Sequence, residues 1–225
     1  MVLFSLLIKK MMYLIILTVV ILILYKRTYN ILVNVRKKVD YNKRIKVLTE
    51  LLEIVLMVEK ISNTHPFALY GTLLGLEREG KFICYDYDVD FGILTTEFDI
   101  FLEDLLKHID TTKYRVRVMN NFLQRKIQII DRETWLNLDI DSMYIDGDYV
   151  KKDDNIGLYN KLMYPDECTK IKVDSIFPLR KKTLDTHTVY VPNNIPDVLR
   201  CYYGDNYMIP DHECSNDCSV CKKKD

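Results

Sequence analysis

The sequence predicts an α+β fold, a sheet flanked by helices, preceded by an N-terminal transmembrane helix. Three strand-like runs follow one another at 114–119, 126–130 and 135–144, and helix-like apolar spacing alternates with such runs elsewhere. With its apolar N-terminus set aside, a chain of 225 residues is long enough for one domain with a substantial core. We therefore expect one catalytic or binding domain.

The membrane anchor is predicted from the run between Met11 and Tyr25. This run is apolar apart from Thr18, and basic residues flank it on both sides. It is shorter than the roughly 20 residues that usually span a bilayer, but flanking lysines can reach toward the membrane surface. A cleaved signal peptide is the alternative, although no small-x-small cleavage pattern follows Tyr25. We assign residues 1–27 to the anchor.

Residues 28–62 predict a stalk that runs into a packed helix. Basic residues come first, and a broad apolar face follows them. The members of that face are Leu48, Leu51, Leu52, Val55, Leu56, Val58 and Ile61. Pro66 ends the pattern, because proline disfavours helix in the residue before it.

The segment after Pro66 predicts a buried strand from Phe67 to Tyr70 that ends at Gly71. A short helix turn follows at 73–78, Gly80 ends it, and residues 82–93 are expected to be extended. Thr95 or Thr96 is expected to cap the next helix. The apolar face of that helix comprises Phe98, Phe101, Leu102, Leu105 and Leu106.

The C-terminal part predicts a strand at Thr188–Val191 and a helix from about Pro196 to Tyr203 that Gly204 stops. Residues 211–225 form a short polar tail that contains cysteines.

Charge composition disfavours binding to polyanions. The 32 lysines and arginines equal the 32 aspartates and glutamates in number, so no global positive field would attract nucleic acid. We expect no nucleic-acid partner, and partners have to be argued from local sites.

Asp86, Asp88 and Asp90 alternate along the extended segment, so their side chains are expected on one face. Carboxylates gathered in this way repel one another unless a cation lies among them, and Mg²⁺ is held by carboxylates together with substrate phosphates. Asp139 and Asp141 repeat the pattern on another predicted strand. The alternative interpretation is a solvated strand face.

A calcium loop of the EF-hand type also competes for the acidic run. Asp86, Asp88 and Asp90 take its first, third and fifth positions, and Glu97 takes the twelfth. However, Phe91 stands where the loop needs glycine, and the preceding segment is extended rather than helical.

These motifs together resemble the LicD/fukutin family. The likeness lies in Gly71-Thr72-Leu73-Leu74-Gly75 with Arg78, Phe82-Ile83, Asp86-x-Asp88-Val89-Asp90, Ile140 to Asp146, Ile176 to Leu179 and Leu199 to Pro210. It implies a nucleotidyltransferase-like mixed sheet over residues 63–210. It also implies transfer of phosphocholine, ribitol phosphate or glycerol phosphate from a CDP-activated donor to a glycan on a glycoprotein or glycolipid. Cys84 and Tyr85 replace the proline and tryptophan usual before the acidic run.

The resemblance also implies roles for the site residues. Asp88 and Asp90 would be the principal ligands of Mg²⁺ or Mn²⁺, with Asp86 beside them. Asp139 or Asp141 would complete the metal site or accept the proton of the acceptor hydroxyl. Donor phosphates would be held by Gly71 and Thr72, and the donor pyrophosphate by Arg78; a surface salt bridge is the alternative role for Arg78.

The function expected from the resemblance is that of a membrane-anchored transferase. Two alternatives stay open: a non-catalytic member of the same fold that binds a glycan or a partner, and a nucleotidyltransferase. The resemblance places the domain in the lumen of the endoplasmic reticulum or Golgi, as a type II protein. The excess of basic residues after the anchor indicates a cytosolic domain instead, so the orientation stays open.

The cysteines allow two kinds of chemistry. In the tail, His212, Cys214, Cys218 and Cys221 can form a tetrahedral Zn²⁺ site. The six cysteines in the chain also suit disulfides in a lumenal domain. Disulfides are favoured if the domain is lumenal, and zinc if it is cytosolic.

Overall fold

The computed structural model describes residues 39–120, 124–153, 168, 170–214, 218 and 221–223, with scattered positions between 10 and 36. It divides into two compact units, Met1–Val39 and Asp40–Asp225. Most of the predicted anchor at 11–25 and the start of the predicted segment 28–62 lie outside the described residues. Among the residues that are described, no helix has the length and apolarity needed to cross a membrane. The anchor therefore stays a prediction.

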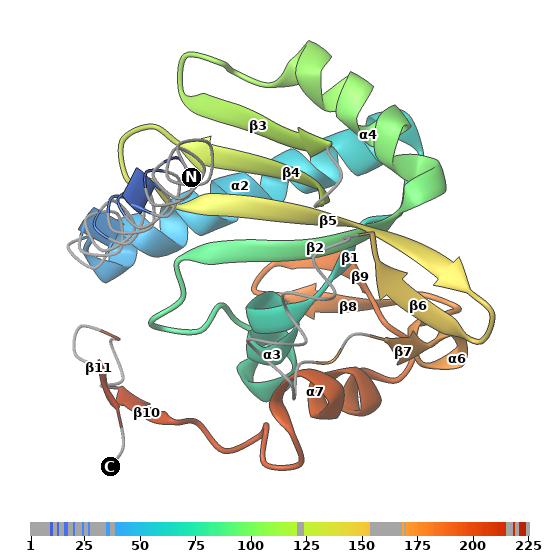
Figure 1. Ribbon diagram of the computed structural model, residues 1–225. Coiled ribbons are helices and arrows are strands. Elements are labelled where there is room, and N and C mark those ends of the chain that lie inside the picture. The colour runs from blue at the N-terminus through green and yellow to red at the C-terminus, as the bar shows by residue number, and fades with distance from the viewer. Residues whose placement is uncertain are drawn as a thin grey trace, which may run out of the picture. The chain divides into compact units, whose positions relative to one another are not determined.

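The second unit is built on one mixed sheet, as Figure 1 shows. Its main path runs β3-β4-β5-β2-β1-β9-β8, and β6 pairs with β5 and β7. The strands are β1 (Phe67–Ala68), β2 (Asp88–Leu94), β3 (Tyr114–Asn120), β4 (Arg125–Asp131), β5 (Asn137–Asp146), β6 (Tyr149–Lys152), β7 (Ile171–Lys172), β8 (Arg180–Leu184) and β9 (His187–Val191). Two pairs are parallel, β2 with β5 and β1 with β9, and the other pairs are antiparallel. The predicted mixed α+β sheet with flanking helices is confirmed.

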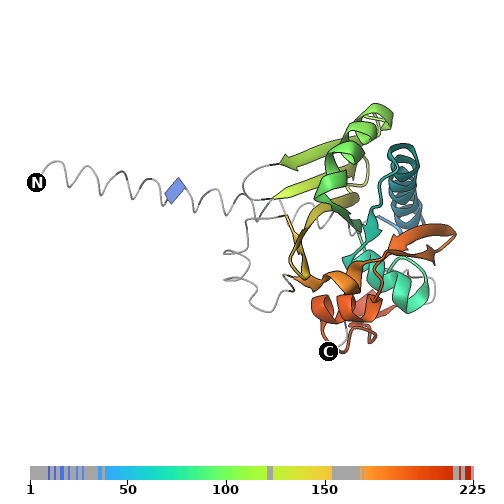
Figure 2. The ribbon, with the colours of Figure 1, turned by 90° about the vertical axis from the view of Figure 1, so that its right-hand side faces the viewer.

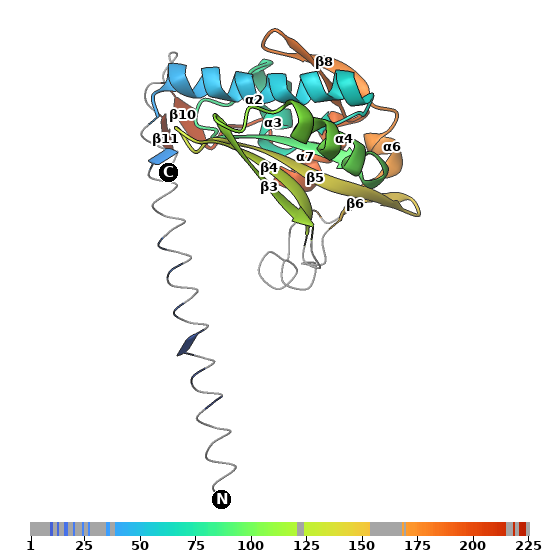
Figure 3. The same ribbon diagram turned by 90° about the horizontal axis from the view of Figure 1, so that it is seen from above.

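The two long helices, α2 (Tyr41–Ser62) and α4 (Thr95–His108), pack together against one face of β2 and β5. Figure 3 shows α2 running along that side of the sheet. Strand side chains on this face are apolar and buried, for example Val89 and Phe91 on β2 and Leu138 on β5. Alternation along each strand therefore turns the aspartates to the opposite face.

A side-chain cap starts helix α2, and its apolar face packs it into the core. The side chain of Asp40 accepts a hydrogen bond from the Lys43 backbone N–H at 3.0 Å, and Asn63 ends the helix in the left-handed conformation. The expected face is buried at Leu48, Leu51 and Leu52 as well as at Val55 and Val58. Ile61 was expected on this face but is 47% exposed, because it lies in the last turn.

The segment between β1 and β2 differs from the expectation. Strand β1 stops at Ala68, and α3 (Tyr70–Glu79) begins at once, so Gly71 and Thr72 lie in the first turn of a helix. Gly80 ends α3 with φ of 67°, as predicted. The extended segment is shorter than expected, since β2 begins only at Asp88.

Two details of α4 are also corrected. Leu94 is its N-cap residue, and no side chain among the described residues caps the helix. Thr95, one of the two predicted caps, hydrogen-bonds Ser142 Oγ and Met143 O across to β5 instead. Phe98, Phe101 and Leu105 are buried as expected, whereas Leu106 is 53% exposed.

The remaining helices are α6 (Val173–Ile176) and α7 (Ile195–Tyr203), which lie next to each other in Figure 2. Helix α7 starts with the side chain of Asn194 accepting from Asp197 N, and Gly204 ends it as predicted. The described tail residues form a small hairpin of β10 (His212–Cys214) and β11 (Cys221–Lys223).

Candidate active site

Three carboxylates meet on the face of the sheet opposite α2 and α4. Asp88 and Asp90 come from β2, and Asp139 comes from β5, where it lies directly beside Asp90 in the parallel pairing. One carboxylate oxygen from each lies within 4.8 Å of the other two. The two acidic strands predicted from the sequence are therefore neighbours, with their acids on the same face.

Asp86 lies just before β2, against the first turn of α3. Its Oδ1 accepts from the Tyr87 backbone N–H at 3.1 Å. A Cβ placed on Gly71 would lie only 2.6 Å from Asp86 Oδ2, so a larger residue here would force the Asp86 side chain to shift. Glycine at position 71 therefore makes room for the Asp86 carboxylate, whether or not it also contacts a ligand.

Thr72 ties α3 to the acidic strand. Its Oγ1 accepts a hydrogen bond from the backbone N–H of Asp90 at 2.9 Å, and its side chain is fully buried. The first turn of α3 is thereby fixed beside the carboxylates. Backbone N–H groups in a first turn have no acceptor within the helix and favour anions.

Two lysines and a glutamine surround the acids of β5, and none of them was predicted from the sequence. Lys126 Nζ lies 2.7 Å from Asp139 Oδ2 and 3.7 Å from Asp141 Oδ1. Gln128 Nε2 donates to Asp139 Oδ1 at 2.9 Å, and Lys152 Nζ lies 2.7 Å from Asp141 Oδ2. Asp141 thus lies between two ammonium groups. Asp139 is held by Lys126 and Gln128 and also faces the β2 acids.

The negative charges of the clustered carboxylates repel one another, which favours the protonated forms of Asp86 and Asp90. Burial raises the pKa of Asp90 well above its ordinary value, and the charges of Asp88, Asp139 and Asp86 add to the effect. Burial and the charge of Asp88 likewise raise the pKa of Asp86. Burial alone would lower the pKa of Lys126, but Asp141 and Asp139 outweigh it and raise that pKa.

The donor set fits a hard divalent cation. Three clustered carboxylates offer only oxygen ligands, which Mg²⁺ and Mn²⁺ prefer. In addition, Asp86 Oδ2 and Asp141 Oδ1 are buried and have no hydrogen-bond partner among the described residues. The EF-hand alternative is wrong, because Asp88 and Asp90 lie within a strand rather than in a loop between two helices.

A cavity of about 370 Å³ opens next to this site. Its lining includes Gly71 and Asp86 on the side of the acids, Arg78 on α3, and Tyr203 and Tyr207 near the C-terminus. Arg78 Nε donates to the Tyr207 carbonyl at 2.8 Å, and its Nη2 reaches both that carbonyl and the carbonyl of Ile209. Arg78 therefore fastens the C-terminal wall of the cavity, and it forms no salt bridge with a described carboxylate.

Tyrosines complete the surroundings of the acids. The rings of Tyr70 and Tyr202 lie 4.5 Å apart between centroids. Burial raises the pKa of Tyr202 and of Tyr203, and nearby aspartates, Asp90 among them, contribute to both shifts. Both phenols therefore stay protonated and can donate hydrogen bonds near the carboxylates.

Comparison with known protein families gives a match to this chain. The model of the LicD/FKTN/FKRP nucleotidyltransferase domain matches residues 63–194. The chain belongs to the LicD/FKTN/FKRP family. The matched range contains all five site aspartates, α3, Lys126 and Lys152. No curated protein matches the chain.

Membership of the LicD/FKTN/FKRP family indicates a transferase of the phosphotransferase type that modifies glycans. The match ends before α7, so Tyr202, Tyr203 and Tyr207 lie beyond it. Lys126 and Gln128 had one sequence signal, the polar residues that alternate with isoleucines on β4. Their place beside Asp141 and Asp139 depends on the strand register, which the sequence does not reveal.

Proposed function

We propose that the protein is a membrane-anchored, metal-dependent transferase. It would move a phosphorylated alcohol, of the phosphocholine, ribitol phosphate or glycerol phosphate type, from a CDP-linked donor to a glycan on a glycoprotein or glycolipid. The observation that carries the proposal is the cluster of Asp88, Asp90 and Asp139 beside the first turn of α3. Family membership supports the reaction type, while the donor and acceptor are our assignment.

Asp88, Asp90 and Asp139 would hold Mg²⁺ or Mn²⁺, with Asp86 next to them. When bound, the cation neutralises charge on the donor's phosphate oxygens. The protein's own residues keep this site in place. Lys126 and Gln128 each hold one oxygen of Asp139, and Thr72 fixes the backbone of Asp90.

The first turn of α3 would bind the donor's phosphates. Its N–H groups are next to the aspartates, and Gly71 allows close approach at this point. Arg78 lies seven residues further along the helix, roughly 10 Å away at 1.5 Å per residue. It would therefore contact an outer part of the donor and keep the cavity wall in place.

The transfer itself needs one proton acceptor. The acceptor hydroxyl oxygen forms a bond to the phosphorus of the phospho-alcohol, the bond from that phosphorus to CMP breaks, and CMP leaves with the electron pair. We assign the hydroxyl proton to Asp141, whose Oδ1 is buried without a hydrogen-bond donor. Lys152 and Lys126 lie beside this carboxylate and would keep it in position.

For location, we propose a single-pass anchor within residues 1–27 and a type II orientation in the endoplasmic reticulum or Golgi. The described cysteines support a lumenal domain, since all six are joined in disulfides and disulfides persist in oxidising compartments.

The test incubates the full chain in detergent with a panel of CDP-alcohols and candidate glycans, followed by mass spectrometry. We expect a glycan mass shift equal to the phospho-alcohol, lost with EDTA and reduced at least about 100-fold in Asp88→Ala and Asp90→Ala. Asp205→Ala is the matched control, because that side chain is 94% exposed. Unchanged transfer under EDTA and in both site variants would overturn the metal mechanism.

A further inference from the structure

Four cysteines gather where the C-terminal hairpin meets the segment before β2. Cys214 and Cys221 face each other across β10 and β11, and Cys84 lies two residues before Asp86. The Sγ atoms of Cys84, Cys214 and Cys221 all lie within 4.8 Å of one another. Cys218 is bonded to Cys84, so a fourth sulfur belongs to the same cluster.

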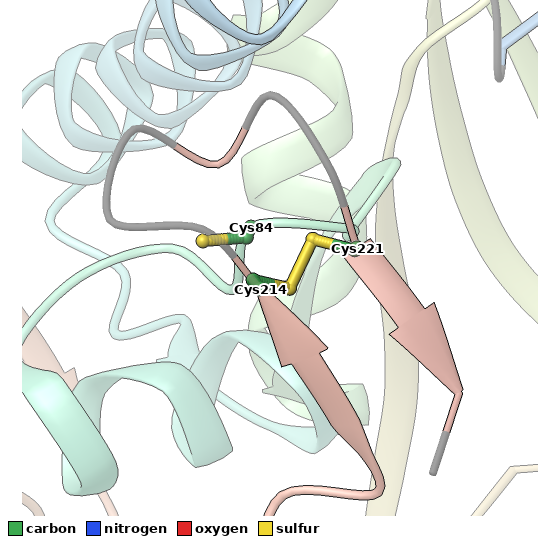
Figure 4. Close-up of side chains that lie close together, drawn as sticks. All are labelled: Cys84, Cys214 and Cys221. Atoms are coloured by element: carbon green, nitrogen blue, oxygen red, sulfur yellow. A yellow bond between two sulfur atoms is a disulfide. The ribbon is translucent and has the colours of Figure 1, made fainter.

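The structure joins these sulfurs as two disulfides, Cys84–Cys218 and Cys214–Cys221. Figure 4 shows the Cys214–Cys221 bond with Cys84 beside it. The third disulfide, Cys168–Cys201, belongs to another part of the chain. Two disulfides this close together contain the four thiols that a tetrahedral metal site needs once they are reduced.

The positions of the sulfurs suit zinc. In a tetrahedral site with Zn–S bonds of about 2.3 Å, ligand sulfurs lie about 3.8 Å apart. The sulfurs of Cys84, Cys214 and Cys221 already lie within 4.8 Å of one another, and Cys218 is held beside Cys84 by their disulfide. On reduction, the two sulfurs of each bonded pair need to separate by only about 2 Å to reach these positions. The tail spacing Cys214-x₃-Cys218-x₂-Cys221 also falls within the range of structural zinc sites.

We propose that in the reduced chain Cys84, Cys214, Cys218 and Cys221 bind one Zn²⁺ ion as thiolates. The thiols release their protons as the metal binds, and no atom changes oxidation state. This ligand set differs from the one expected within the tail, because Cys84 takes the place of His212. Cys84, and not His212, is the residue that the structure groups with Cys214 and Cys221.

The zinc site would fasten the hairpin to the catalytic segment. Tyr85 follows Cys84, lines the cavity, and donates to Asp211 Oδ1 at 2.9 Å. The centroids of the His212 and Tyr85 rings lie 4.1 Å apart. Disulfides hold this contact in an oxidising compartment, and zinc would hold it where thiols stay reduced.

The test measures zinc bound to the full chain in detergent, reduced with a phosphine and then dialysed free of excess metal. We expect one zinc ion per chain by elemental mass spectrometry, and thiolate-to-metal absorption when Co²⁺ replaces zinc. Cys84→Ser should weaken zinc binding at least about tenfold. The oxidised chain should lack the thiolate band.

Three controls separate this site from others. Cys168→Ser/Cys201→Ser and His212→Ala should keep full zinc binding, and Asp90→Ala should leave the thiolate absorption unchanged. Cys84→His, which restores a zinc ligand, should recover binding if Cys84→Ser lost it through the missing ligand rather than through misfolding. Absence of zinc from the reduced wild type, or normal binding by Cys84→Ser together with loss in His212→Ala, would overturn the proposal.

Discussion

At the scale of single residues, Asp90 is in an environment that opposes its own charge. Burial and the neighbouring aspartates raise its pKa, so the folded chain keeps a proton that the unfolded chain has already released. Between the ordinary carboxyl pKa of about 4 and the raised pKa, stability therefore falls as the pH rises. A bound cation would remove this penalty.

We predict that Asp90→Asn is more stable than the wild type at neutral pH in EDTA, and that its stability depends less on pH. Thermal unfolding measures this, since each kcal/mol shifts Tm by roughly 2–4 °C at this domain size. Added Mg²⁺ should stabilise the wild type but not the variant, while Asp205→Asn should behave as wild type throughout. An Asp90→Asn chain that is less stable than wild type at every pH would contradict the account.

Gly71 offers a second test at this scale. Alanine is normally better than glycine in a helix by about 0.5–1 kcal/mol, but here its Cβ would clash with Asp86 Oδ2. We predict that Gly71→Ala costs roughly 1–3 kcal/mol in the wild type and becomes neutral or stabilising in an Asp86→Ala background. Chemical denaturation of the four chains measures the coupling.

The control for this cycle is Glu79→Ala, an exposed position on the same helix. It should give the same small change with either residue at position 86. Equal costs of Gly71→Ala in both backgrounds would show that the close approach to Asp86 does not explain this glycine.

At the scale of elements, the site depends on how β4, β5 and β6 meet. Lys126 on β4 is 16% exposed in its side chain and lies between two acids of β5. We predict that Lys126→Met destabilises the metal-free chain by about 3–5 kcal/mol, because it leaves the buried carboxylate of Asp139 without its ammonium partner. Lys151→Met, at the neighbouring exposed pair with Asp146, should change stability by less than about 1 kcal/mol.

The link between α3 and the C-terminal segment depends on Arg78. Arg78→Met keeps the length of the side chain but removes its hydrogen bonds to the carbonyls of Tyr207 and Ile209. We predict that amide hydrogen exchange around 204–211 accelerates by roughly 10-fold or more, with little change in β2 and β5. Arg132→Met is the control, because it removes a similar exposed hydrogen bond, from Arg132 Nε to the Thr111 carbonyl, far from this segment; it should not change this exchange.

At the scale of the catalytic unit, the sequence predicted what depends on local patterns. The alternation of Asp88 and Asp90 and the apolar face of α2 follow from periodicity, and both are present in the structure. Asp86, expected in the same extended run, instead lies before β2. Register and long-range contacts were not predictable. Nothing local shows that Lys126 pairs with Asp141, that Gly71 lies in a helix against Asp86, or that Cys84 meets the tail.

The central claim is that Asp88, Asp90 and Asp139 together hold one divalent cation. Electron paramagnetic resonance can measure it directly, because free Mn²⁺ loses its sharp signal when it binds the protein. We predict one Mn²⁺ bound per chain, tighter in the presence of a CDP-alcohol, and at least about tenfold weaker in Asp139→Asn and Asp88→Asn. Asp146→Asn, on the exposed end of β5, should bind as wild type does. No Mn²⁺ binding by the wild type, or equal binding by all three variants, would contradict the account.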